Sequence, residues 1–422
     1  MASPPLLRAL AFAAARVAAT AAGPQGPLPW VVVSEAPSGR ASDPGHQLST
    51  FRSGPISLDV GRVVLTPPKE TPLRMPPEPF VLTSLHLEVV RAADGQSVPL
   101  TEVYNHHVAL YADGGKLGAD LCGGAHLDSL DSLIGLGAEA RGTSLELPEG
   151  FALPGAGPWL ANIHLIRSEG VPDVKRCIEC TCEEGGGSED CCRHGSLCPG
   201  FPRGEAGRNA SDVKEYALQY TIGWSPNASL YTLAKYMTLD ATGCQLEFQI
   251  PARCPWMWRH DGPHGPLPGA VGLRGSGRSL PSDFVAAARP PVPECVARVA
   301  WDYELPPGAH GEVIFSKGHV HIGGLNVSAY VLRQGTGSPE LLCASTARYG
   351  RSEPLPAAKA GDELGYVVGM SSCRFGLPGQ RPMVRPGDRI RVEAAYRTDL
   401  WFNGVMGLLD LAVAPRAPDQ LI

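Results

Sequence analysis

The sequence predicts an all-β protein made of two jelly-roll-like β-sandwich domains with a cysteine-rich insertion. The chain has 422 residues, which is enough for two domains that each bury a full core. Its 50 Gly and 41 Pro supply frequent turn signals, and short runs of strand-forming residues lie between them. Amphipathic patterns of helical period are scarce, so only short helices are expected.

Composition divides the chain into segments. Residues 23–55 are rich in Pro, Gly and Ser and are expected to be irregular, whereas residues 261–293 lack periodicity and are expected to form a disordered loop. The predicted division is a signal or transit peptide at 1–22, the irregular segment at 23–55, a first β-sandwich domain at 56–170, the cysteine-rich insertion at 171–208, and a second β-sandwich domain at 209–415 that contains the loop at 261–293.

Short alternating or apolar runs mark the expected strands of both domains. In the first domain these strands are at 57–60, 80–90, 103–111 and 159–166. In the second domain they are at 216–222, 245–250, 296–301, 313–315, 328–332, 365–369, 389–394 and 408–413.

The N-terminal segment indicates a secretory route. Its weak apolar core is followed by Ala19-Thr20-Ala21, which resembles a signal-peptide cleavage site, but Arg16 interrupts the core and keeps organelle import as the alternative. The 12 cysteines and the sequons at Asn209, Asn227 and Asn326 favour a secreted or lumenal glycoprotein with disulfides. No later stretch reaches the ~18 apolar residues of a membrane span, so no transmembrane segment is expected.

Half of the cysteines fall in one short segment rich in Gly, Glu and Asp. They are Cys177, Cys180, Cys182, Cys191, Cys192 and Cys198. In an oxidising compartment such a segment is expected to form a small disulfide knot, and a zinc or copper thiolate site is the alternative. Cys343 and Cys373 are expected to pair with each other within the second domain.

Six side chains on or beside predicted strands are candidate metal ligands: His106, His107, His164, His319, His321 and Met406. Imidazole suits copper, and the soft thioether of a methionine favours Cu(I). Three imidazoles in the first half, then two imidazoles and a thioether in the second, predict two separate copper sites. The ordinary alternatives are surface or core histidines and a methionine that fills the core.

The spacing within these sets differs. His319 and His321 alternate along a strand and therefore point to one face, which suits two ligands of one ion. His106 and His107 are neighbours, so both reach one ion only if the strand is locally distorted. Glu139 and Arg141 are also spaced to contact a ligand, although a structural salt bridge is their more ordinary role.

Charge and motifs argue against several other classes. The formal net charge is −6 and no basic stripe is present, so nucleic acid is not expected as a partner. The sequence contains no G-x-S-x-G elbow, no P-loop and no dinucleotide-binding fingerprint.

Several motifs together resemble the stress up-regulated nodulin (Nod nineteen) family of plants and green algae. These motifs lie at 102–107, 137–143, 163–166, 177–182, 365–373 and 404–408, and the resemblance extends from about residue 56 to 415. That family has no well-defined biochemical activity. The resemblance therefore implies kinship with the family but does not imply a reaction.

A more distant resemblance is to the copper type II, ascorbate-dependent monooxygenases, the peptidylglycine and dopamine hydroxylases. It is based on the two histidine pairs, His164, Met406 and their order along the chain. It implies two jelly-roll domains, two copper ions and ascorbate as the reductant. By this resemblance His106, His107 and His164 hold the electron-storing copper, and the later three residues hold the oxygen-activating copper as catalytic ligands: His319, His321 and Met406.

The chain departs from those hydroxylases at positions that recognise substrate. Leu408 and Asp410 stand where polar recognition residues are found, and Lys317 stands where an arginine precedes the H-x-H motif. The expected function is therefore a monooxygenase-like protein that hydroxylates a small molecule or peptide of unknown identity, with one copper site in each domain and a solvent-open interface between them. The alternative is a non-catalytic secreted stress-response protein with the same double jelly-roll.

Overall fold

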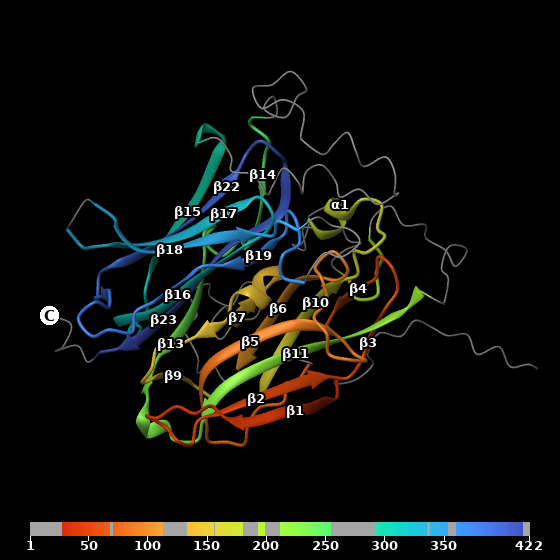
Figure 1. Cartoon of the computed structure of the whole chain (residues 1–422). Helices are drawn as coiled ribbons and strands as arrows, with labels where there is room; N and C mark the ends of the chain where they lie inside the picture. Colours follow the sequence, from red (N-terminus) through yellow and green to blue (C-terminus); the bar gives the residue numbers. More distant parts are fainter. Residues whose placement is uncertain are drawn as a thin grey trace, which may run out of the picture.

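A computed structural model describes residues 28–67, 71–112, 133–155, 157–179, 193–198, 212–254, 293–335, 338–352 and 360–416. These residues form four β-sheets with a few short helices, which confirms the all-β prediction. Figure 1 shows them as two sandwiches that pack against each other, one coloured from red to green and the other mostly from teal to blue, with β13 and β14 in green.

The first sandwich contains an eight-stranded and a four-stranded sheet. The larger sheet has the order β1 (Trp30–Pro37), β2 (Gln47–Ser53), β11 (Lys214–Ser225), β5 (Val81–Arg91), β9 (Phe151–Pro154) and β12 (Thr232–Leu233), with β3 (Ile56–Leu58) beside β11 and β8 (Leu145–Glu146) beside β5. The smaller sheet has the order β4 (Val63–Leu65), β10 (Trp159–Ile166), β6 (Tyr104–Ala112) and β7 (Leu133–Leu136).

The second sandwich contains a six-stranded and a five-stranded sheet. The first of these has the order β13 (Lys235–Asp240), β23 (Phe402–Pro415), β16 (Gly311–Val320) and β20 (Ser372–Arg374), with β14 (Glu247–Ile250) beside β23 and β21 (Met383–Val384) beside β16. The other has the order β15 (Val296–Glu304), β22 (Arg389–Arg397), β17 (Gly324–Leu332), β18 (Glu340–Tyr349) and β19 (Val367–Met370).

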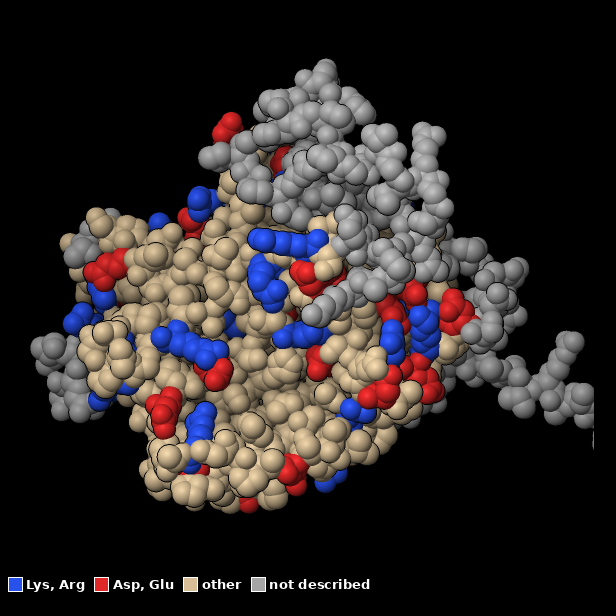
Figure 2. All heavy atoms as spheres, viewed as in Figure 1, with Lys and Arg blue, Asp and Glu red and all other residues tan. Residues whose placement is uncertain are grey.

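Four short helices complete the described elements: η2 (Ala138–Gly142), α1 (Val174–Ile178), η5 (Ala228–Leu230) and η7 (Pro293–Cys295). Among the described helices, none has the length and apolar character needed to cross a membrane. On the face shown in Figure 2, acidic and basic side chains are interspersed over the described surface.

Two parts of the predicted division differ from the structure. Residues 23–55 were expected to be irregular, but β1 and β2 lie there and join the largest sheet. The predicted domain boundary placed β11 in the second domain, whereas β11 pairs with β2 and β5 of the first. Both differences arise because these strands are stabilised by pairing with distant segments, and composition does not report such pairing.

The predicted leader at 1–22 lies outside the described residues, as does nearly all of the predicted loop at 261–293. The structure describes the cysteine-rich insertion only at 171–179 and 193–198.

Three disulfides are formed among the described cysteines. The predicted bond between Cys343 and Cys373 is present, and a second bond joins Cys254 to Cys295. In the insertion, Cys177 pairs with Cys198, and both side chains are buried. The remaining cluster members, Cys180, Cys182, Cys191 and Cys192, lie outside the described residues. Bonds of this kind are typical of an oxidising compartment.

The interface between the sandwiches is closed by apolar packing. One cluster of buried side chains includes Ile314, Phe315, Ala412 and Ala414 of the second sandwich together with the core of the first. The interface is therefore packed over this region, and the opening between the sandwiches is limited to the hollow beside Met406 that is described below. Apolar residues on β16 and β23 turn toward the first sandwich, and leaving them in water would lose the free energy of their burial.

Helix η2 carries polar contacts across the same interface. At its end, the backbone N–H of Met370 donates to Thr143 Oγ1 at 2.6 Å, and that hydroxyl lies 3.2 Å from the Met370 carbonyl. Arg141 forms ion pairs of 3.4 Å with Glu88 of the first sandwich and with Glu363 beside the second. Glu363 in turn accepts the Leu100 N–H at 3.0 Å.

A buried ion pair of the second sandwich also contacts the first sandwich. Lys317 on β16 is 0% exposed, and its Nζ lies 3.1 Å from Asp410 Oδ2 on β23. The same ammonium donates to the Gly135 carbonyl of the first sandwich at 3.2 Å, and Thr238 Oγ1 donates to Asp410 Oδ1 at 2.9 Å. The charges are thus paired and hydrogen-bonded out of water, which is the condition for a buried pair to be tolerated.

Removal of one partner of this pair is expected to destabilise the fold strongly. Asp410→Ala leaves the Lys317 ammonium buried without its counter-charge, which is expected to lower the free energy of unfolding by about 3–5 kcal/mol. Asp302→Ala is the matched control, because it breaks the part-exposed pair with Arg391 and should cost no more than about 1 kcal/mol. Urea denaturation of both variants measures the difference, and equal losses would contradict the assignment.

Candidate metal centre

A β-bulge brings two adjacent histidines to one place. In the pairing of β6 with β10, Val108 lies opposite Ile163 and His107 opposite His164, but Leu165 lies opposite Asn105, which leaves His106 as an extra residue. A bulge of this type bends the strand and redirects a side chain that would otherwise point to the other face. The local distortion of the strand that His106 and His107 need in order to reach one ion is therefore present.

The bulge assembles the first predicted triplet. One ring nitrogen from each of His106, His107 and His164 lies within 4.8 Å of those of the other two. The His106 ring stacks on the His164 ring with 4.4 Å between centroids, and the His107 ring lies 5.1 Å from that of His164. His106 and His164 are buried, whereas His107 is partly exposed.

Asn162 orients the His107 ring. His107 Nε2 lies 2.6 Å from Asn162 Oδ1, and the Asn162 Nδ2 donates to the Thr66 carbonyl, which fixes the direction of the amide. Because an amide oxygen only accepts, His107 donates from Nε2 and keeps its lone pair on Nδ1. That Nδ1 faces the Nδ1 of His106 at 3.4 Å.

The second predicted triplet lies at the end of the β16–β23 pair. His319 lies opposite Leu408 and Val320 opposite Gly407, and the His319 and His321 rings are 5.2 Å apart. The Tyr396 hydroxyl accepts the His321 N–H at 3.0 Å and donates to the Met406 carbonyl, so it joins the two chain segments that carry the ligands. All three candidate side chains are buried.

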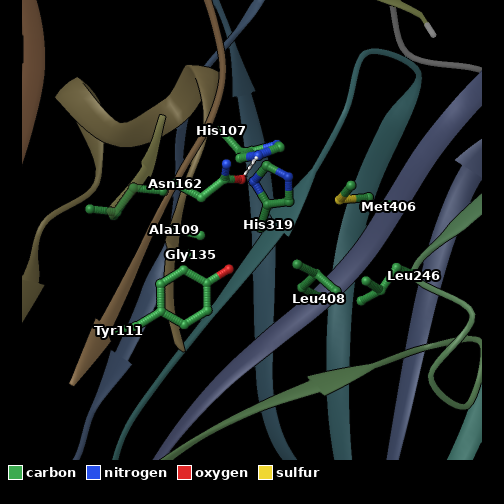
Figure 3. A pocket seen from close by; sticks show the side chains of 10 residues that line it. His107, Ala109, Tyr111, Gly135, Asn162, Leu246, His319, Met406 and Leu408 are labelled. Atoms are coloured by element: carbon green, nitrogen blue, oxygen red, sulfur yellow. Dashed lines mark hydrogen bonds between the residues drawn. The ribbon is translucent and has the colours of Figure 1, made fainter. Parts of the chain in front are cut away.

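Met406 and His319 line one small hollow of about 50 Å³ between the sandwiches. In Figure 3, His107, Asn162 and His319 lie on one side of this hollow, and Met406, Leu408 and Leu246 lie on the other. The complete lining is His107, Ala109, Tyr111, Gly135, Leu136, Asn162, Leu246, His319, Met406 and Leu408. A space of this size admits water or a comparably small molecule.

The two triplets adjoin instead of lying apart. The His106 ring of the first sandwich and the His321 ring of the second meet edge to face with 5.0 Å between centroids. Two separate sites were expected, one in each domain. The structure instead places all five histidines in one cluster at the interface, with His106 in contact with His107, His164 and His321.

Burial keeps three of these imidazoles, those of His106, His107 and His321, neutral near pH 7. Loss of hydration lowers the pKa of His106 well below its usual value, and the neighbouring histidines lower it further. Burial also lowers the pKa of His321 to about 3, with His319 acting in the same direction. For His107 burial outweighs the hydrogen bond to Asn162, and the pKa is about 4. A neutral imidazole is the form that donates a lone pair to a metal.

The donor set fits a transition metal. His106 Nε2 and His321 Nε2 are buried and have no hydrogen-bond partner among the described residues. An unpaired buried polar atom costs about 1–3 kcal/mol, and coordination to an ion would remove that cost. Imidazoles with one thioether suit copper better than calcium or magnesium, which take oxygen ligands.

Sequence reasoning identified the six candidates but not the residues that hold them. Asn162 lies two residues before His164 on the same strand, so alternation could have placed its side chain on the same face. Glu139 Oε1 lies 2.9 Å from His319 Nδ1, a contact between segments 180 residues apart that no local pattern indicates. The expected structural salt bridge is correct for Arg141, which pairs with Glu88 and Glu363.

The carboxylate of Glu139 is charged inside the interface. Burial alone would raise its pKa, but the neighbouring His319 and the Lys317 ammonium outweigh burial and lower the pKa to about 2. The centre therefore combines the neutral imidazoles of His106, His107 and His321 with the negative charge of Glu139.

Acid is expected to destabilise the copper-free protein through His321. Unfolded His321 binds a proton below pH ~6.5, whereas the folded ring stays neutral down to about pH 3, so the unfolded state holds more protons and stability falls as the pH falls between these values. The substitution His321→Gln removes this group. It should reduce the change of the free energy of unfolding with pH by about 1.4 kcal/mol per pH unit. Urea denaturation between pH 6 and 4.5 measures it, and an unchanged slope would contradict the prediction.

Comparisons with known proteins give one family. Residues 286–416 match the model of the family described as stress up-regulated Nod 19, which confirms the resemblance to this family that the motifs predicted. No curated protein matches the chain.

Several solved structures give weak matches. They include the infectious bursal disease virus VP2 subviral particle (10% identity, TM-score 0.18, 92% of this chain and 75% of that chain). The Sputnik virophage structure matches with 8% identity and a TM-score of 0.21 over 100% of this chain and 96% of that chain. Paenibacillus xanthan lyase matches with 11% identity and a TM-score of 0.15 over 92% of this chain and 26% of that chain. These TM-scores are too low to support an argument about fold or function. The match to the stress up-regulated Nod 19 family is confined to residues 286–416 of this chain.

Proposed function

We propose that this protein is a copper-dependent, ascorbate-reduced monooxygenase-like protein that hydroxylates a small molecule or peptide. The observation that supports the proposal most directly is the bulge at His106, which brings ring nitrogens from His106, His107 and His164 within 4.8 Å of one another. The proposal assigns one ion to this triplet and a second to His319, His321 and Met406.

When bound, copper supplies one-electron chemistry and the activation of oxygen. Residues of this chain orient the ligands that would hold the copper. Asn162 holds His107 so that Nδ1 is presented to the first site. Tyr396 ties the His321 backbone to that of Met406. The soft thioether of Met406 favours the reduced ion at the site that must meet oxygen.

Contact between the triplets gives a short route for an electron. The His106 and His321 rings are 5.0 Å apart across the sandwich interface. Apolar packing around the cluster also limits the access of water, which protects reactive species from side reactions.

The hollow beside Met406 restricts what part of a substrate enters. Its walls include Leu246, Leu408, Tyr111 and Met406, and its volume is about 50 Å³. Asp410, which stands at a position that recognises substrate in the copper hydroxylases, is bound to Lys317 and Thr238 here. We infer that a small, uncharged group reaches the site and that the recognition used by those hydroxylases is replaced.

We also propose a secreted or lumenal location. The disulfides suit an oxidising compartment. Asn227 is exposed as a residue, although its Nδ2, the atom that a glycan would modify, donates to Asp43 Oδ1 at 2.9 Å. Asn326 is less favourable because it is partly buried on β17.

One observation favours the alternative of a non-catalytic, metal-binding stress-response protein. His106 and His164 are at most 1% exposed, and the hollow of about 50 Å³ leaves little room for a substrate. A protein that only holds the ions needs no such room. Both alternatives are expected to bind copper. A measurement of turnover therefore distinguishes the enzyme from the non-catalytic binding protein.

Met406→Leu is expected to separate the two triplets. The wild-type chain should bind about two copper ions and consume oxygen when ascorbate is supplied. Loss of the thioether should reduce that oxygen uptake to background while copper stays on His106, His107 and His164. Elemental analysis and an oxygen electrode measure both quantities.

Met237→Leu is the matched control, because Met237 is buried on β13 in the same sandwich and lies outside the cluster. It should retain both copper and oxygen uptake. Full oxygen uptake by Met406→Leu would refute the assignment of the second triplet. Two coppers in the wild type without any oxygen uptake would favour the binding protein.

A further inference from the structure

A carboxylate that contacts a candidate ligand belongs to the opposite sandwich. Glu139 lies on η2 of the first sandwich and is 0% exposed. Its Oε1 lies 2.9 Å from Nδ1 of His319, which lies on β16 of the second sandwich. The contact therefore spans the domain interface.

The hydrogen-bond pattern determines which His319 nitrogen is free. Glu139 Oε1 also accepts the Gly137 N–H at 3.2 Å, so this oxygen acts as an acceptor. His319 must then donate from Nδ1, and its lone pair remains on Nε2. A hydrogen bond from the second ring nitrogen to a carboxylate is the usual way in which a protein orients a metal-binding histidine.

The turn around Glu139 is built to admit the His319 ring. A Cβ atom at Gly137 would lie 2.4 Å from His319 Cε1 and 2.9 Å from Glu139 Oε2, so a larger residue would displace the ring or the carboxylate. Asn105 Nδ2 donates to the Gly137 carbonyl at 2.8 Å and holds the turn against β6. Asn105 precedes His106, so the same strand supports both the first triplet and this turn.

We propose that Glu139 is a positioning residue that fixes the His319 tautomer, so that the first sandwich completes the metal site of the second. The metal-binding part of this inference rests on the proposed function. Residues 286–416, which match the family model, therefore contain His319, His321 and Met406. They do not contain Glu139, whose hydrogen bond to Nδ1 of His319 leaves Nε2 free for a metal.

A purely structural ion pair is the competing explanation, and Glu363 provides the control for it. Glu363 is also 0% exposed at the same interface, where it pairs with Arg141 at 3.4 Å and accepts the Leu100 N–H at 3.0 Å. It contacts none of the candidate ligands in the described contacts. Glu363→Gln therefore weakens the docking of the sandwiches without removing a partner from His319.

The first experiment reads the tautomer directly in the full-length, copper-free chain. Long-range ¹H–¹⁵N NMR of histidine-labelled protein should show His319 protonated at Nδ1 in the wild type, with the signal assigned by its absence in His319→Gln. Glu139→Leu removes the acceptor and should shift the ring to a mixture of tautomers, whereas Glu363→Gln should leave it unchanged. An unaltered Nδ1–H form in Glu139→Leu would overturn the proposal.

The second experiment measures affinity and uses the isosteric Glu139→Gln, which keeps the shape of the side chain. Competition with a Cu(I) chelator should show an affinity about 10–100-fold weaker at one of the two sites, with the other site and Glu363→Gln unchanged. Equal weakening by both variants would overturn the positioning role. If the wild type binds no copper, the proposed function fails, and the tautomer experiment still decides the role of Glu139.

Discussion

The structure depends on the packing that closes the two sandwiches over five imidazoles. Phe315 and its apolar neighbours pack between the sandwiches, and η2 ties the halves together through Arg141 and Thr143. Burial has two consequences at once. It keeps His106 and His321 neutral and able to donate lone pairs, and it leaves their Nε2 atoms without described partners. Both consequences favour a bound ion, which links the stability of the interface to the chemistry of the site.

Strands supply the two histidine pairs in different ways. His319 and His321 use simple alternation, whereas His106 and His107 require an inserted residue. The orienting groups also differ in origin. Asn162 comes from the strand next to its histidine, but Glu139 reaches across the domain interface. The second triplet consequently relies on correct docking, and the first triplet is built within a single sheet.

The sequence predicted the all-β class, the ligand candidates and the bond between Cys343 and Cys373, because alternation, residue type and compartment are local or compositional signals. It did not predict β1 and β2, which pair with each other, nor the pairing of β2 with β11, which spans more than 150 residues. It also did not predict the apolar packing between the sandwiches or that Glu139 lies beside His319. These features depend on how sheets dock, and docking is determined by contacts between segments that no short motif relates.

The central claim is that the histidine cluster at the sandwich interface holds copper. Diffraction from crystals of the copper-loaded protein, recorded at the copper absorption edge, tests it most directly. We expect one anomalous peak about 2.0–2.1 Å from ring nitrogens of His106, His107 and His164, and a second peak among His319, His321 and Met406. A cluster without a peak, or copper found only at the cysteine-rich insertion, would contradict it.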